Sequence, residues 1–393
     1  MRTPHSARAL VLVLLLGSCC LAAPSALAGA AERAVIVVLD GLRATEGFDD
    51  PAFRYIPHMA LELAPQGALA RACDNMGVTL TIPGHSAIAS GRYQNLPDDG
   101  TVRPFLPLLW EYYRAATGAS DGSVAIVTTK RKIRCLTYST YASYGSADSA
   151  RAIGPTWDDA ATVQEFLNDM VVHRPVVAFL NLGEIDGQAH TGSWNAYTRA
   201  ILKTDSVVAI LWHGIQADPV YRGRTTLIIT GDHGRHTDGY GDWSEHGDGC
   251  PGCRRIPLLA IGPHFGAGVV SWTACQQTDI LKTVASTIGL AVPLAGGRVL
   301  TELMRGAASV RTADASDGRL RIEIQGSSAR FTAPPVAGTV SVYDVGGRNI
   351  GSRDLAGQAT WTWKGPASGV FFYRFTVMGS YPPQHSGRLI LLR

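Results

Sequence analysis

Three short apolar runs, each followed within a few residues by an aspartate, constrain the fold of this chain most strongly. The runs cover residues 34–39, 176–182 and 225–230. They are rich in β-branched residues and free of charge, which is typical of buried strands in a parallel sheet. Ligands bind outside the carboxyl ends of strands in open α/β sheets. We therefore expect a ligand site there, formed by Asp40, Asp186 and Asp232.

Histidines accompany two of these aspartates. His190 follows Asp186 by four residues, and His233 follows Asp232 directly, in a turn flanked by glycines that permit unusual backbone angles. Either pattern alone is commonly a solvated pair or an ordinary loop. Their joint occurrence at strand ends, together with Asp40, favours a metal site instead. A mixture of carboxylates and imidazoles suits zinc, with manganese or iron as alternatives.

A threonine precedes a predicted helix in the segment 78–91. Pro83 fits the first turn of this helix, and Gly91 fits its end. Thr81 would then lie at or just before the helix N-terminus, where free N–H groups and the dipole favour an anion. A hydroxyl bound to a divalent cation there can lose its proton and act as a nucleophile. The alternative is that Thr81 only caps the helix.

The motifs follow one order along the chain: Asp40, Thr81-Ile-Pro-Gly-His85, Asp186-x-x-x-His190, Asp232-His233-Gly234 and His246. This order resembles the alkaline phosphatase superfamily. Within the superfamily it is most similar to the branch of nucleotide pyrophosphatase/phosphodiesterases and Thr-nucleophile phosphatases. The resemblance covers residues 34–290.

The resemblance implies two divalent metal ions, with zinc as the first choice and manganese as the alternative. The side chains that would bind one ion are Asp186, His190 and His246. Those that would bind the other ion are Asp40, Asp232 and His233. By the same resemblance, Thr81 would be the catalytic nucleophile, bound to the ion of Asp40, Asp232 and His233 and transiently phosphorylated.

The last ligand has a competitor. His236 and His246 both lie in the loop that follows the Gly-Asp-His-Gly turn. We favour His246, because the apolar stretch 256–263 follows it and resembles the last core strand of the superfamily.

Three further residues would bind the substrate. Lys130 and Lys132 follow a predicted strand at 123–129 and resemble the Lys-x-Lys element that grips a dianionic phosphate in monoester phosphatases. The alternative is a solvated basic loop. Asn95 is similar in place to an asparagine that donates to a phosphate oxygen in this branch. We therefore expect a phosphomonoesterase that acts on a small-molecule phosphate ester through a phosphothreonine.

Other functions stay open beside this one. Within the same chemistry, the alternative is a phosphodiesterase or nucleotide pyrophosphatase. From another class, it is a non-catalytic binding protein on the cell surface with the same fold. A sulfatase is disfavoured, because its nucleophile is an oxidised Cys or Ser, which Thr81 cannot replace.

The N-terminus predicts export. Arg2 and Arg8 precede a short apolar stretch at 9–16, and residues 26–28 offer a small-x-small cleavage site, so residues 1–28 read as a signal peptide. We expect a secreted, periplasmic or cell-surface bacterial protein. Lipid attachment at Cys19 is the alternative. No other segment is long and apolar enough to suggest a transmembrane helix.

Five cysteines would remain after cleavage at residue 28, so at least one thiol would be unpaired. Cys250 and Cys253 have a C-x-x-C spacing, but one such pair cannot complete a four-ligand zinc site. We expect a local disulfide between them. The net charge of +3 is too small to indicate nucleic-acid binding.

The fold class follows from the alternation of predicted strands and helices. Helical patterns cover 104–117, 158–173, 193–216 and 278–290. Such alternation predicts a doubly wound, mainly parallel α/β sheet with helices on both faces, here a catalytic domain over 29–305.

The pattern changes near residue 306. Residues 306–318 are small and polar and read as a linker, while 319–393 hold short alternating runs separated by turn residues. These runs predict a small antiparallel β-sandwich. It resembles immunoglobulin-like C-terminal modules of secreted bacterial proteins, some of which act as sorting signals for the export machinery.

Overall fold

The computed structural model describes residues 32–306, 320–325, 328–332, 337–344, 348–356, 359–366, 369–377 and 385–391. The expected signal peptide and the lipidation alternative at Cys19 lie outside these residues. All of the expected linker after residue 306 lies outside them as well. The domain boundaries therefore stay a prediction.

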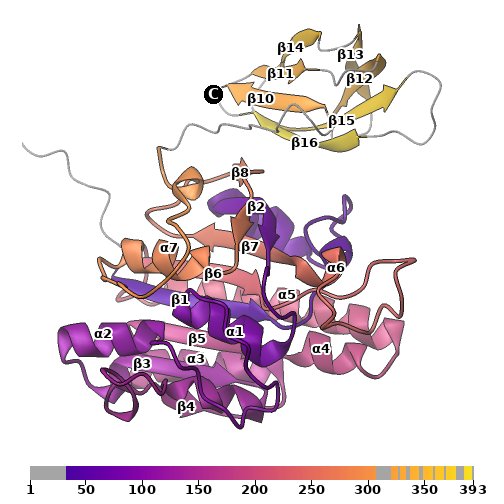
Figure 1. Ribbon diagram of the computed structural model, residues 1–393. Helices are drawn as coiled ribbons and strands as arrows, with labels where there is room; N and C mark the ends of the chain where they lie inside the picture. The colour runs from indigo at the N-terminus through magenta and orange to yellow at the C-terminus, as the bar shows by residue number, and fades with distance from the viewer. Residues whose placement is uncertain are drawn as a thin grey trace, which may run out of the picture.

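A single large sheet forms the centre of the first 306 residues (Figure 1). Its strands lie in the order β4 (Arg151–Ile153), β3 (Val124–Thr128), β5 (Val177–Leu182), β1 (Arg33–Leu39), β6 (Thr225–Gly231), β7 (Arg255–Ile261), β2 (Ala68–Asp74) and β8 (Val269–Ser271). The short strand β9 (Cys275–Gln276) also pairs with β2. The pairs from β4 to β6 are parallel, whereas β7 is antiparallel to both β6 and β2.

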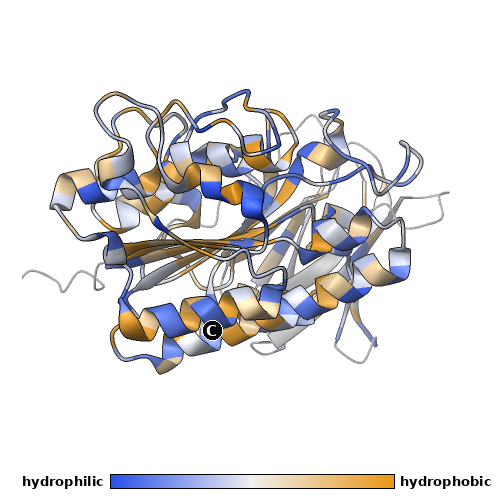
Figure 2. Ribbon diagram, turned by 90° about the horizontal axis from the view of Figure 1, so that it is seen from below, coloured by the Kyte–Doolittle hydropathy of each residue, from blue (hydrophilic) through white to orange (hydrophobic). Residues whose placement is uncertain are grey.

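Helices cover both faces of this sheet, as the edge-on view in Figure 2 shows. They are α1 (Thr81–Ser90), α2 (Leu109–Thr117), α3 (Asp159–Val172), α4 (Glu184–Ala189), α5 (Trp194–Ala217), α6 (Pro251–Arg254) and α7 (Asp279–Thr287). Shorter turns are η1 (Ala44–Glu46), η2 (His58–Leu63), η3 (Ala64–Gln66), η4 (Asp121–Ser123), η5 (Arg131–Thr137), η6 (Ser146–Asp148) and η7 (Thr301–Leu303). In the part of the chain that the structure describes, no helix combines the length and apolar character needed to cross a bilayer.

Alternate side chains of the central strands feed two separate hydrophobic cores. In β1, Ile36 packs into a core with residues of α1, α2 and α7, while Val37 packs into a core with residues of α3 and α5. Successive strand side chains point to opposite faces of a sheet, so a strand buried on both sides reads as a continuous apolar run. The expected α/β fold with helices on both faces is therefore confirmed.

The chain ends in small antiparallel sheets, as expected. One has the order β10 (Arg321–Gln325), β11 (Ser328–Thr332), β14 (Thr360–Lys364). The other has the order β13 (Asn349–Leu355), β12 (Gly338–Tyr343), β15 (Gly369–Val377), β16 (His385–Leu391). Residues of both sheets, among them Phe331 and Phe375, share one hydrophobic core.

The helix ends carry the signals that the sequence suggested. Gly91 ends α1 with a φ of 68°, a left-handed conformation that glycine adopts without strain. Asp158 caps α3 by accepting a hydrogen bond from the Ala161 amide. The predicted helix at 104–117 begins later, at Leu109. It cannot start in the segment 104–107, because Pro104 and Pro107 restrict the residues before them.

Candidate metal centre

Two neighbouring parallel strands bring the first ligand group together. Asp40 follows β1, while Asp232 and His233 follow β6, and the register pairs Leu39 with Gly231. The three side chains are buried, and their ligand atoms lie within 4.8 Å of one another. We call Asp40, Asp232 and His233 the first ligand group.

The donor atoms of this group fit a divalent cation. His233 Nε2 lies 3.7 Å from Asp40 Oδ1 and 3.5 Å from Asp232 Oδ2. These three buried atoms have no hydrogen-bond partner among the described residues. Ligands of a tetrahedral zinc ion are separated by roughly 3.3–3.8 Å. Buried polar atoms are costly without a partner, so their convergence at this spacing indicates a cation site.

The other atoms of the group are oriented by hydrogen bonds. Asp232 Oδ1 accepts from the amides of Gly41 (3.2 Å) and His233 (2.9 Å), and Asn181 Nδ2 donates to Asp40 Oδ2 at 3.0 Å. His233 Nδ1 lies 2.9 Å from the Gly234 carbonyl oxygen, which leaves Nε2 free to bind a metal.

The pKa values of the two carboxyl groups shift in opposite directions. Burial, with the Asp232 charge, raises the pKa of Asp40. Burial acts in the same direction on Asp232, but the nearby His233 and His85 outweigh it, so the pKa of Asp232 lies below its ordinary value. Two carboxylates this close repel each other, and a cation between them relieves the repulsion.

Helix α4 and a long loop bring the second ligand group together. Asp186 lies in α4, His190 follows the helix directly, and His246 comes from the loop after β6. Their ligand atoms also lie within 4.8 Å of one another. Asp186 Oδ1 lies 3.3 Å from His190 Nε2 and 3.6 Å from His246 Nε2. We call Asp186, His190 and His246 the second ligand group.

His246 is prepared to act as a neutral ligand. Burial, and next the neighbouring His233, lowers the pKa of His246 to about 3. Its Nδ1 lies 3.1 Å from the Thr79 carbonyl oxygen, so Nε2 points to the second ligand group. His236, the competing histidine, lies instead beside Asp248, Cys250 and Cys253.

Two cationic side chains, Lys130 and Arg235, form ion pairs with aspartates of the ligand groups. Lys130 Nζ lies 2.8 Å from Asp40 Oδ2 and also forms an ion pair with Asp186 Oδ2, so it bridges the two ligand groups. Although burial opposes the charge, these two carboxylates raise the pKa of Lys130. Arg235, which is fully buried, forms an ion pair with Asp186 Oδ1.

Thr81 is the first residue of α1 and is buried. The helix lies against the end of β6, because a Cβ atom on Gly84 would come within 2.6 Å of the Asp232 carbonyl oxygen. His85, one turn further, has Nδ1 2.8 Å from the Thr81 carbonyl oxygen and 3.3 Å from Asp232 Oδ2. The N-terminus of α1 is therefore fixed beside the first ligand group.

The remaining predicted residues are placed differently. Lys132 forms an ion pair with Asp98 at 2.6 Å, and Asp98 in turn accepts a hydrogen bond from the Ile82 amide in the first turn of α1. Asn95 has an exposed side chain on the segment after α1, and the structure brings it into neither ligand group.

Two polar residues of the site, Asn181 and Arg235, were missed from the sequence, and His85 was quoted in the Thr81 motif without a role. Asn181 could have been found, because it is the single polar side chain within the apolar run of β5. Arg235 gave no signal, since a charged residue after a glycine turn is normally solvated.

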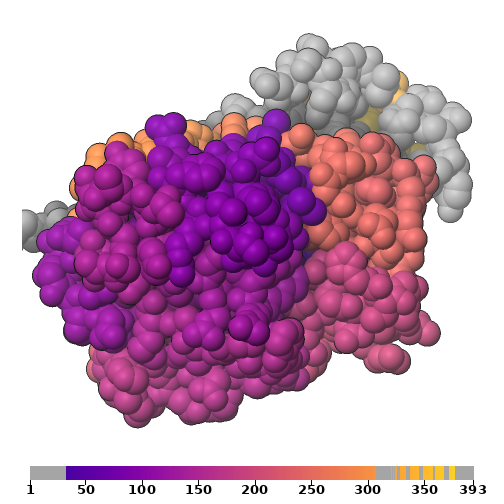
Figure 3. Space-filling model, turned by 60° about the horizontal axis from the view of Figure 1, so that its bottom comes forward, coloured from indigo at the N-terminus to yellow at the C-terminus, as the bar shows by residue number. Residues whose placement is uncertain are grey.

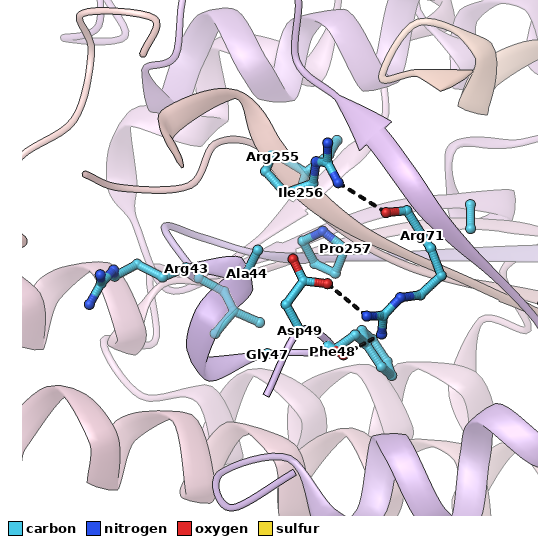
Figure 4. Close-up of a pocket in the computed structure, with 11 residues that line it drawn as sticks. Arg43, Ala44, Gly47, Phe48, Asp49, Arg71, Arg255, Ile256 and Pro257 are labelled. Atoms are coloured by element: carbon cyan, nitrogen blue, oxygen red, sulfur yellow. Dashed lines mark hydrogen bonds and ion pairs between the residues drawn. The ribbon is translucent and has the colours of Figure 1, made fainter. Parts of the chain in front are cut away.

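A surface pocket lies apart from both ligand groups. It is lined by Arg43, Phe48, Asp49, Arg71, Arg255 and other residues around η1, β2 and β7 (Figure 4). Two of its arginines pair with neighbouring groups of the protein. Arg71 pairs with Asp49 at 2.9 Å, and Arg255 donates to the Arg71 carbonyl oxygen at 3.0 Å. We assign no ligand to this pocket.

The cysteines correct one expectation. All five cysteines in the described part of the chain are free and buried, so the expected Cys250–Cys253 disulfide is absent there.

Comparison with known proteins supports the fold and the general chemistry. The Metalloenzyme superfamily model matches residues 145–291. A protein of the alkaline phosphatase superfamily from Vibrio parahaemolyticus has a similar structure, with a TM-score of 0.51 at 12% identity. The superposition covers 85% of this chain and 79% of that one, and it confirms an alkaline phosphatase-like fold.

Curated relatives include GPI ethanolamine phosphate transferase 1 from two organisms. The protein of Gibberella zeae is 27% identical over 273 residues, which cover 61% of this chain and 26% of the relative. The protein of Mus musculus is 26% identical over 310 residues, which cover 67% of this chain and 32% of the relative. The chain thus spans about a quarter to a third of the length of these relatives.

These relatives overturn two expectations. The expectation of a secreted phosphomonoesterase is wrong, because the relatives are ethanolamine phosphate transferases. The expected secreted, periplasmic or cell-surface bacterial location is also wrong, because the relatives are GPI ethanolamine phosphate transferases of Gibberella zeae and Mus musculus. The monoester argument rested on Lys130 and Lys132, and both pair with carboxylates of the protein itself.

Proposed function

Because the chain belongs to the alkaline phosphatase-like Metalloenzyme superfamily, we propose that it is a metal-dependent transferase for a substituted phosphoryl group. The donor would be a phosphodiester and the acceptor an alcohol. The names of the relatives favour ethanolamine phosphate as the group transferred. The observation that carries the proposal is the meeting of two ligand groups beside the N-terminus of α1, where Thr81 lies.

The two ligand groups would each hold one divalent cation, and we propose zinc for both. Carboxylate and imidazole donors at these separations suit that ion. Bound there, the ions would neutralise the phosphoryl oxygens and favour the ionised Thr81 hydroxyl.

Thr81 is the proposed nucleophile. Its Oγ1 forms a bond to phosphorus while the bond from phosphorus to the donor alcohol breaks, and that alcohol leaves with a proton. The acceptor hydroxyl then forms a bond to phosphorus, loses its proton, and Thr81 is released. The substituent stays on phosphorus throughout, so the intermediate is a diester of Thr81.

The protein surroundings favour this placement. Thr81 lies at the N-terminus of α1, where the helix dipole favours an anion. Lys130 carries a positive charge between the ligand groups, where a phosphoryl group in contact with both cations would lie. We propose that Lys130 binds a phosphoryl oxygen, with Asp40 and Asp186 holding its ammonium group in position.

The test uses zinc-loaded full-length protein with a chromogenic aryl ester of ethanolamine phosphate and glycerol as acceptor. We expect release of the aryl alcohol, formation of the glycerol diester, and trapping of one ethanolamine phosphate group on the peptide that contains Thr81. Thr81→Ala should lower turnover by at least about 10³-fold and abolish the adduct, because the nucleophile is lost.

Thr81→Ser is the matched control, since it retains a hydroxyl and should keep the adduct. An adduct in Thr81→Ala, or product formed from water at every glycerol concentration, would contradict the transferase proposal.

A further inference from the structure

Four metal-ligand side chains lie together outside the candidate metal centre. They are His236, Asp248, Cys250 and Cys253, whose ligand atoms all lie within 4.8 Å of one another. His236 comes from the loop after β6, and the other three come from the segment that leads into and forms α6. We call these four residues the cysteine cluster.

The ring nitrogens of His236 lie among the other donor atoms of the cysteine cluster without a hydrogen bond to any described residue. His236 Nε2 lies 3.3 Å from Asp248 Oδ2, yet both ring nitrogens of His236 are buried without a hydrogen bond within the described ranges. Both thiols are free and at most 4% exposed. A buried imidazole without a partner, beside two thiols and a carboxylate, is an arrangement that a metal ion would satisfy.

The backbone builds this arrangement without help from an ion. The Gly234 amide donates to the Cys253 carbonyl oxygen at 2.8 Å, which joins the two segments. A Cβ atom on Gly252 would lie 2.5 Å from the Arg235 carbonyl oxygen, so the segments approach more closely than any other residue permits. The Cys253 amide also donates to Cys250 Sγ at 3.4 Å, which orients that sulfur.

We propose that the cysteine cluster is a structural zinc site, distinct from the two ligand groups of the candidate metal centre. Two thiolates, one imidazole and one carboxylate complete a four-coordinate shell, which is typical of zinc sites without an open position. Thiolates favour zinc over the hard cations that carboxylates alone would bind. The C-x-x-C pair thus finds its other two ligands at positions that the sequence spacing did not reveal.

The position of the cysteine cluster gives the proposed ion a structural role. It would join both ends of the loop that carries His246, since His236 lies before that residue and Cys250 after it. The same loop contacts the segment before α1, where the Gly249 amide donates to Thr79 Oγ1 at 3.2 Å. The ion would therefore fix His246 in the second ligand group without touching a substrate.

The experiment measures bound zinc in the purified full-length protein after removal of loosely bound metal. We expect about three zinc ions per chain in the native protein and about two in Cys250→Ser/Cys253→Ser. Cys135→Ser is the matched control, because it removes a buried free thiol outside the cluster and should keep the native zinc content. Equal zinc content in the native protein and the double variant would overturn the proposal.

A second measurement needs no variant that might fold poorly. Cobalt added to the metal-free native protein should produce a sulfur-to-cobalt charge-transfer band, and zinc should protect Cys250 and Cys253 from alkylation. Absence of the band, equal alkylation with and without zinc, or a Cys250–Cys253 disulfide in the isolated protein would each contradict the site. These readouts do not depend on turnover, so they stay separate from the transferase proposal.

Discussion

The two ligand groups offer a cation similar chemistry on different foundations. The first ligand group lies on the ends of β1 and β6, which pair in the middle of the sheet, and all three of its side chains are buried. The second depends on the short helix α4 and on a loop, and His190 is 46% exposed. Its members come from segments that no strand ladder holds.

The first ligand group is therefore the fixed half of the site, and the second ligand group is the adjustable half. Strand ends in a parallel sheet are positioned by hydrogen bonds on both sides, so their donors need little further support. A loop donor such as His246 needs support from elsewhere, here from the Thr79 carbonyl oxygen and, as we propose, from the cysteine cluster. Figure 3 shows that the early segments of the chain, in indigo, pack directly beside the later segments in salmon.

The largest effect is expected in the first ligand group. Asp232→Asn removes the charge of a proposed cation ligand that also orients the turn, so turnover should fall by about 10⁴-fold and one zinc ion per chain should be lost. Kinetics and metal analysis measure both. Asp121→Asn, at an exposed acid in η4, is the control. Full activity in Asp232→Asn would remove this group from the site.

A smaller effect is expected in the second ligand group. His190→Ala removes an exposed donor, so zinc affinity should fall by about 10–100-fold, and added zinc should restore much of the activity. Zinc titration of turnover measures the shift. If excess zinc also rescued Asp232→Asn, the two halves would not differ in the way that their burial indicates.

The smallest effect is expected at Asp159, which supports the start of α4. It is a change in the free energy of unfolding with pH. Burial, reinforced by the Glu184 charge, raises the pKa of Asp159 to about 7, and Asp159 Oδ1 accepts from the Glu184 amide at the start of α4 at 3.2 Å. As pH rises above about 4, Asp159 ionises in the unfolded chain before it ionises in the folded protein. The free energy of unfolding should therefore fall by on the order of 2–4 kcal/mol up to about pH 7.

Urea unfolding between about pH 4 and pH 8 measures this slope, and Asp159→Asn should flatten it because residue 159 no longer ionises. The Asp121→Asn protein should keep the native slope. An unchanged slope in Asp159→Asn would assign the pH dependence to other groups.

The sequence predicted the strand ends well, because their signal is local. The runs before Asp40 and Asp232 are apolar on both faces, and that pattern arises only when a strand is covered twice. The antiparallel placement of β7 against β6 and β2 was not predicted, because strand direction depends on the path of the connecting loops rather than on composition.

The cysteine cluster and Arg235 show the opposite case. His236 and Asp248 meet only because two glycine-containing segments cross, and the spacing of Cys250 and Cys253 does not encode that crossing. The buried charge of Arg235 depends on Asp186, which is 49 residues away along the chain. Contacts of this range are set by the completed fold.

Gly84 leaves no clearance for even a methyl group between α1 and the end of β6. A helix held so tightly cannot shift against β6, so under the proposed function both alcohols would have to reach a Thr81 of fixed position. Position 84 would then tolerate no replacement, because any side chain there would collide with the Asp232 backbone. Laboratory selection for altered acceptors should therefore leave Gly84 unchanged.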